Sequence, residues 1–182
     1  MIPEFYARDG HGIPTTWVAR MRNSMASLTP RFSANRAVGE YTEQHYLPAA
    51  ATYRERAADK GAVGRNIVNW EHALKEKWGA LRCGAVKVQT NAAQHIFEAE
   101  VHLNDLDPKF VRVELYANGI DGSGPVREEM TRVRPLAGAD SGYAYVAQVP
   151  ATRRVTDYTA RVIPHCDGVA IPLEDSRIQW QR

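Results

Sequence analysis

Two acidic side chains are the first candidates for chemistry in this sequence. Glu98 and Glu100 lie two positions apart in a run that alternates polar and apolar residues. On an extended strand they share one face, about 6–7 Å apart. A glycosidase with an acid and a base carboxylate could use that separation. Alternating polar residues on a sandwich strand are usually its solvated face, and we expect that role for this pair.

Nucleophiles and metal ligands form no set in the sequence. The six histidines are scattered, no pair of them has the i, i+4 spacing of a metal-binding helix face, and no Cys-x-x-Cys or Gly-x-Ser-x-Gly motif occurs. The glycine-rich run 119–124 lacks the Gly-Lys-Ser/Thr ending of a phosphate-binding loop. We therefore expect no metal site and no catalytic residue in this chain.

Two tyrosines are the candidates for ligand contact. Tyr143 and Tyr145 share one face of an alternating run. If that face is outward, the rings could stack on a glucan, and if it is inward, they belong to the core. The intervening Ala144 and Val146 are both apolar, so the sequence leaves the direction open.

The composition is that of an ordinary globular protein. The 182 residues are 44% hydrophobic and 24% charged, with a net charge of +2, which argues against disorder and against nucleic acid as a partner. No apolar run is long enough for a transmembrane helix, and no basic-then-apolar leader is present. Cys83 and Cys166 match no metal or redox spacing. We expect a cytoplasmic protein with no membrane partner.

The predicted elements that position these residues change from helices to strands near Gly84. Before it, apolar residues at helical spacing predict about four helices, at 14–28, 33–47, 48–59 and 65–81. After it, alternation with a period of two predicts about seven short strands, at 86–89, 97–103, 111–115, 126–133, 143–149, 158–163 and 177–180. The predicted fold class is α+β, with a helical segment at 1–83 and an antiparallel immunoglobulin-like β-sandwich domain at 84–182.

Two ordered stretches near the N-terminus resemble a known family. The first runs from Ile2 to Pro14 (IPEFYARDGHGIP) and is followed by WVARM at 17–21. The second runs from Leu28 to Tyr41 (LTPRFSANRAVGEY) and leads to YLP at 46–48. Both resemble the C-terminal end of bacterial α-1,4-glucan phosphorylases, the glycogen and maltodextrin phosphorylase group. The β-rich remainder resembles the C-terminal extension of some members.

The resemblance implies a chemistry that this chain does not carry by itself. Members of the family hold pyridoxal phosphate on a lysine, between two Rossmann-like domains, and transfer glucosyl units from α-1,4-glucan to phosphate. The family's lysine motif lies upstream of the matched segment. None of the five lysines here has its context, and they are Lys60, Lys75, Lys77, Lys87 and Lys109. The resemblance therefore implies no catalytic or cofactor-binding residue in this chain.

The resemblance also implies partners. As a C-terminal fragment, the chain would pack its helices on the missing catalytic domains of the same enzyme, with α-glucan as a further ligand. We expect an exposed apolar patch along Trp17, Met21, Met25 and Phe32, or its burial in a homodimer. The alternative function is a stand-alone carbohydrate-binding or protein-interaction module. A third hypothesis, a small glycosidase, would need Glu98 and Glu100 in one cleft.

Overall fold

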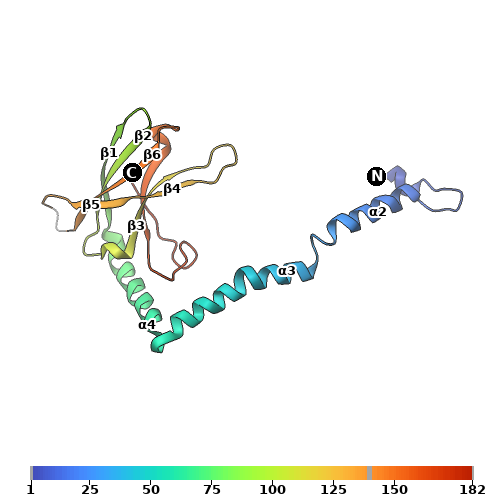
Figure 1. Cartoon of the computed structure of the whole chain (residues 1–182), viewed down its shortest axis with the longest axis horizontal. Helices are drawn as coiled ribbons and strands as arrows, with labels where there is room; N and C mark the ends of the chain where they lie inside the picture. The colour runs from blue at the N-terminus through green and yellow to red at the C-terminus, as the bar shows by residue number, and fades with distance from the viewer. Residues whose placement is uncertain (1, 139–140, 182) are drawn as a thin grey trace. The chain divides into compact units, whose positions relative to one another are not determined.

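The chain forms two compact units, Met1–Glu55 and Arg56–Arg182, in a computed structural model that describes residues 2–138 and 141–181. The first unit is helical and contains α1 (Ile2–Tyr6), α2 (Thr15–Leu28), α3 (Ala34–Tyr41), the π-helical turn η1 (Thr42–Tyr46) and the start of α4 (Leu47–Lys77) (Figure 1). None of residues 2–55 is buried. This unit therefore has no hydrophobic core of its own.

One aspartate organises the loop between α1 and α2. Asp9 Oδ1 accepts hydrogen bonds from the backbone N–H groups of His11 and Ile13, at 2.9 and 3.0 Å. Arg8 donates to the carbonyl of Gly12 at 3.0 Å. Gly12 has a φ of +77°, a conformation that glycine adopts without steric cost. The Arg-Asp-Gly-x-Gly part of the first matched stretch thus forms a turn that satisfies its own polar groups.

The helix boundaries follow local signals. Ser33 caps α3 as its Oγ accepts from the backbone N–H of Arg36 at 3.3 Å, and α2 ends at Leu28, ahead of Pro30. The predicted helices at 48–59 and 65–81 fall largely in α4, on either side of a break where its backbone is non-helical from Ala58 to Gly61. The second ends at Lys77 and is followed by the 3-10 turn at Trp78–Ala80. With the unexpected short α1, the expected count of about four helices is not confirmed.

The second unit contains two antiparallel four-stranded sheets. The first has the strand order β1-β2-β6-β5 and the second the order β4-β3-β7-β8. Their bounds are β1 (Arg82–Thr90), β2 (Gln94–His102), β3 (Val111–Ala117), β4 (Val126–Glu129), β5 (Thr131–Pro135), β6 (Gly142–Pro150), β7 (Tyr158–Pro164) and β8 (Gln179–Trp180). Single turns of 3-10 helix occur at η2 (Trp78–Ala80), η3 (Pro108–Phe110) and η4 (Val155–Asp157). The α+β class and the antiparallel pairing agree with the sequence pattern.

One predicted strand is divided between the two sheets. The run 126–133 was expected to be a single strand, but β4 pairs with β3 whereas β5 pairs with β6. Met130 is the one residue between them, it is 3% exposed, and its N–H donates to the carbonyl of Val113 at 2.8 Å. The chain therefore crosses from one sheet to the other at this residue.

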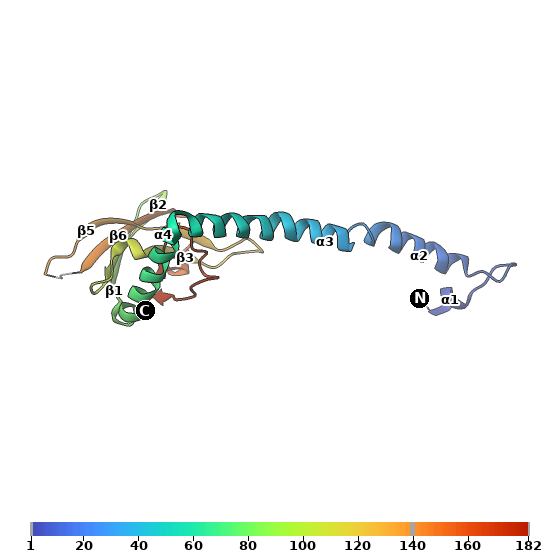
Figure 2. The same cartoon turned by 90° about the horizontal axis from the view of Figure 1, so that it is seen from below.

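The C-terminal part of α4 belongs to the core of the second unit. Ile67, Trp70 and Leu74 are buried in one cluster with residues from both sheets, and Trp70 Nε1 donates to the carbonyl of Phe110 at 3.2 Å. Figure 1 shows this part of α4 leading into β1, and Figure 2 shows it beside the strands. The compact unit therefore begins at Arg56, whereas the spacing of apolar residues changes from helical to alternating near Gly84. Among the described residues, no helix is long and apolar enough to cross a membrane.

Candidate functional site

The two candidate carboxylates lie on an outer sheet face, each next to a basic side chain. Glu98 Oε1 accepts from Arg134 Nη2 at 2.7 Å, and Glu100 lies 3.7 Å from Lys87 Nζ. Residues two apart on β2 share a face. Lys87 comes from the neighbouring strand β1, and Arg134 comes from β5, which lies beyond β6 in the same sheet. This arrangement is typical of cross-strand ion pairs on a solvated face, and it gives neither carboxylate an enclosed cleft.

The buried histidine of β2 has a structural environment. His95 is 6% exposed, and its two ring nitrogens lie 2.8 Å from Thr90 Oγ1 and 2.8 Å from the carbonyl of Arg153. Both ring nitrogens are thus used inside the fold. Within the described part of the chain, no group of three His, Cys, Asp or Glu side chains could hold a metal ion.

The tyrosines of β6 share the inner face of the first sheet. Tyr145 is 5% exposed and belongs to the core cluster, and Tyr143 is half-buried against that cluster. The guanidinium of Arg132 lies 5.0 Å from the centroid of the Tyr143 ring. Tyr145 therefore points inward and belongs to the core, which is one of the two directions that the sequence left open. Glucan contact by this pair stays a prediction, for which Tyr143 has the more exposed ring.

The apolar face of α2 and Phe32, in the turn that follows it, are uncovered within the first unit. Met21 is 48%, Met25 65% and Phe32 68% exposed. Trp17 is half-buried because Phe5 of α1 packs edge-to-face on it, with ring centroids 5.6 Å apart. We call Trp17, Met21, Met25 and Phe32 the helical face. Its exposure matches the predicted apolar patch, while its use as an interface stays a prediction.

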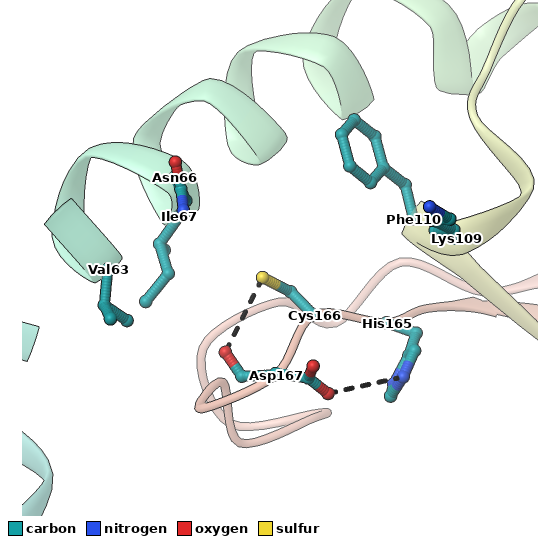
Figure 3. Close-up of a pocket in the computed structure, with 8 residues that line it drawn as sticks. All are labelled: Val63, Asn66, Ile67, Lys109, Phe110, His165, Cys166 and Asp167. Atoms are coloured by element: carbon teal, nitrogen blue, oxygen red, sulfur yellow. Dashed lines mark hydrogen bonds and ion pairs between the residues drawn. The ribbon is translucent and has the colours of Figure 1, made fainter. Parts of the chain in front are cut away.

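One cavity of the second unit has one apolar and one polar side. Val63 and Ile67 of α4 line it together with Phe110, opposite a loop that carries His165, Cys166 and Asp167 (Figure 3), and its volume is about 500 Å³. We call it the helix–loop cavity.

The cysteine that lines the helix–loop cavity has low reactivity. Burial, followed by the charge of Asp167, raises the pKa of the Cys166 thiol, so little reactive thiolate is present at neutral pH. The thiol contacts the carbonyl of Asp167 at 3.7 Å, and the Asp167 carboxylate lies 3.9 Å from His165 Nε2. Among the described residues no hydrogen bond joins His165 to the Cys166 thiol, so the histidine does not activate it.

A second cavity, of about 380 Å³, lies beside the crossing at Met130. We call it the crossover cavity. Three basic residues line it, namely Lys109, Arg112 and Arg132, together with Tyr145. Sequence reasoning missed it because these residues come from three separate stretches.

Charged and aromatic side chains form a packed array on the outer face of the second sheet. Glu114 is only 5% exposed and accepts hydrogen bonds from Arg112 Nε at 3.1 Å and Arg161 Nη2 at 2.7 Å. The guanidinium of Arg161 lies 4.5 Å from the ring centroid of Tyr116 and 5.3 Å from that of Trp180. The alternation of Arg112, Glu114 and Tyr116 was the available sequence signal. Because the charged groups of the array pair with one another, it resembles a structural network more than an open binding platform.

The lysines do not fit the pyridoxal phosphate that the resemblance implies for the whole enzyme. A Schiff-base lysine needs a desolvated pocket. Lys60, Lys75, Lys87 and Lys109 are exposed, and half-buried Lys77 donates to the carbonyl of Asp105 at 3.0 Å.

Comparison with known proteins gives relatives of one kind. The glycogen phosphorylase of Mycobacterium tuberculosis strain H37Rv is 28% identical over 172 residues, which cover 89% of this chain and 20% of the relative. The maltodextrin phosphorylase of Thermococcus litoralis is 26% identical over 187 residues, covering all of this chain and 22% of the relative. The glycogen phosphorylase of Aquifex aeolicus is 35% identical over 46 residues, covering 25% of this chain and 7% of the relative.

No family model matches the chain, and no solved structure matches it. The chain spans about a fifth of the length of the two relatives that cover most of it. The predicted resemblance to glycogen and maltodextrin phosphorylases is confirmed over most of the chain, and it is consistent with a C-terminal region of a bacterial phosphorylase.

Proposed function

We propose that this chain is the C-terminal region of an α-glucan phosphorylase-like glycosyltransferase, and that the helical face docks on the catalytic domains of that enzyme. One observation carries the proposal: the unit that bears the matched stretches has no buried residue among positions 2–55. Apolar side chains such as Met25 and Phe32 are more than 60% exposed, and covering them in a larger enzyme gains hydrophobic free energy.

We infer that this chain and the remainder of the enzyme have different roles. The chain holds no pyridoxal phosphate and is inactive by itself, and the remainder of a cytoplasmic enzyme supplies cofactor and catalysis. The second unit is an appended immunoglobulin-like sandwich. Its orders β1-β2-β6-β5 and β4-β3-β7-β8 correspond to the A-B-E-D and C′-C-F-G orders of such folds, which supports this assignment.

A chimera tests the proposal. The matching C-terminal fifth of the Mycobacterium tuberculosis relative is removed or replaced by this chain, and formation of glucose 1-phosphate from glycogen and phosphate is measured. We expect the truncated enzyme to be inactive and the chimera to regain activity. A truncated enzyme as active as the chimera, or glucose 1-phosphate made by this chain alone, would contradict the proposal.

A matched pair of variants tests the helical face within the chimera. Met25→Asp places a charge on that face, and Leu173→Asp places one on the 88% exposed Leu173 of the second unit. We expect only the first to lower activity. Sedimentation of the isolated chain distinguishes the homodimer: a monomer–dimer equilibrium abolished by Met25→Asp would favour self-association as the cover.

The alternative function, a carbohydrate-binding module, depends on Tyr143. Its half-buried ring and the stacked Arg132 offer an apolar surface with a polar neighbour, which is how proteins bind sugar rings. Affinity electrophoresis of the chain in a glycogen gel should show retardation that Tyr143→Ala removes. An unretarded wild-type chain would leave the sandwich without this role.

A further inference from the structure

A loop covers one side of the helix–loop cavity. It joins β7 to β8 and spans residues 165–178. Its first residues, 165–167, lie opposite Val63 and Ile67 of α4 (Figure 3). The position of this loop relative to α4 therefore decides how open the cavity is.

One arginine ties the loop to the start of the second unit. Arg56 donates to both carboxylate oxygens of Glu174, at 2.8 and 2.9 Å, and also to the carbonyl of Gly168. Glu174 Oε2 accepts a further hydrogen bond from the backbone N–H of Ala170 at 2.7 Å. Two points of the loop are thus gathered on one guanidinium, in the bidentate geometry that makes arginine–carboxylate contacts strong and specific. We call Arg56, Gly168 and Glu174 the arginine latch.

The backbone beside the latch is strained. The helical geometry of α4 is interrupted at 58–61, where the φ angles of Asp59 and Lys60 are +50° and +57°. A left-handed φ costs free energy in residues that have a Cβ, and it persists where surrounding contacts hold it. Arg65 donates to the carbonyl of Lys60 on one side of this break, and Arg56 is held by the loop on the other. Loss of the latch would therefore free the strained segment together with the loop.

The latch is exposed enough to open. The side chains of Arg56 and Glu174 are 28% and 36% exposed, and ion pairs that contact water add little to stability. The part of the loop that can move is short. The N–H of His165 donates to the carbonyl of Phe110 at 2.8 Å, and Val169 packs against the core cluster. Opening thus concerns residues 166–168, which lie between these two anchors and include a contact of Arg56.

We propose that the arginine latch is a gate that controls access to the helix–loop cavity. When the latch is closed, residues 166–168 lie against the cavity and shield its apolar side, where Ile67 is only 8% exposed. When it opens, these residues move away from α4 and the apolar side becomes accessible. This gate does not depend on the proposed function.

The labelling rate of Cys166 measures the opening. Cys83→Ala leaves Cys166 as the one thiol of the chain, and its reaction with an aromatic disulfide reagent is followed by absorbance at neutral pH. In this background, Arg56→Ala and Glu174→Ala should each speed the labelling about three- to tenfold, because each removes the bidentate contact. Arg54→Ala, at an exposed arginine two residues before the latch, should leave the rate unchanged.

The loss of a charge by itself would change the rate in the opposite direction. Burial and then the charge of Asp167 raise the pKa of Cys166, while the positive charge of Arg56 opposes them. Removing that charge in Arg56→Ala reduces the fraction of reactive thiolate and slows the reaction. Faster labelling of this variant therefore reports opening of the loop.

The second cysteine separates local opening from general destabilisation. In a Cys166→Ala background, labelling follows Cys83, which belongs to β1. We expect Arg56→Ala and Glu174→Ala to leave the Cys83 rate unchanged. An unchanged or slower Cys166 rate in either variant would overturn the proposal. So would an equal acceleration of Cys83, or of Cys166 in Arg54→Ala, because the effect would then not belong to the latch.

Discussion

Shortening one side chain of α4 should destabilise the whole second unit. Leu74 is 0% exposed and lies in the cluster that joins α4 to both sheets. Leu74→Ala removes its contacts and leaves a cavity, and such changes in a core cost about 2–5 kcal/mol. Val68, on the same helix, is 50% exposed, so Val68→Ala should cost less than about 1 kcal/mol.

The expected loss can be converted into a melting temperature. Unfolding entropy is about 2.1 cal/mol/K per residue near 60 °C, and the unit spans residues 56–182, which gives about 0.27 kcal/mol/K. A loss of about 3 kcal/mol from Leu74→Ala then lowers the melting temperature by about 11 °C. Val68→Ala should lower it by less than about 4 °C.

Two optical signals report on the same transition. Far-UV circular dichroism follows the sheets. Tryptophan fluorescence includes Trp70, which is 1% exposed at the helix–sheet contact and is one of four tryptophans in the chain. If α4 is part of the core, both signals should shift together in Leu74→Ala, as expected of one cooperative unit. Sheets that melt at the wild-type temperature while the fluorescence transition moves would refute the reasoning.

Three smaller changes probe other parts of the second unit. Gly119→Ala should destabilise the β3–β4 loop, since a Cβ there would collide with the carbonyl oxygen of Ser123, and melting by circular dichroism should fall; an unchanged melt would show that the loop can rearrange. Hydrogen bonds from Arg56, then from a backbone amide, lower the pKa of Glu174. Its stabilising effect is therefore full above the ordinary glutamate pKa of about 4.3 and lost as pH falls through the lowered value, so an acid titration should show a steeper loss for wild type than for Glu174→Gln. Burial raises the pKa of Cys83, so in a Cys166→Ala variant its reaction with a disulfide reagent at neutral pH should be slow until urea is added; fast labelling of the native chain would contradict this.

The sequence pattern predicted what depends on neighbours along the chain. Alternation located most of the strands, and the predicted helix at 65–81 has Ile67, Trp70 and Leu74 at helical spacing on the face that is buried. The predicted boundaries near Pro30 and Ser33 agree with the structure because capping and the missing proline N–H operate within a few residues. These features need no knowledge of distant partners.

Features that depend on distant pairing could not be predicted. The run 126–133 alternates in a way that a single strand also would, and only the pairing partners of Glu129 and Thr131 assign its halves to different sheets. The direction of Tyr145 was open for the same reason. The crossing brings Lys109 and Arg132 to the same crossover cavity, so no local sequence motif predicts this cavity.

The crossing at Met130 has a mechanical consequence. A single buried residue links a strand of one sheet to a strand of the other, so the two sheets are covalently tethered at their shared edge. Sliding one sheet over the other would have to pull Met130 out of the interior and break its hydrogen bond to Val113. Under an applied force, we expect the sandwich to yield by peeling of the two-residue strand β8, while the tethered edge resists shear.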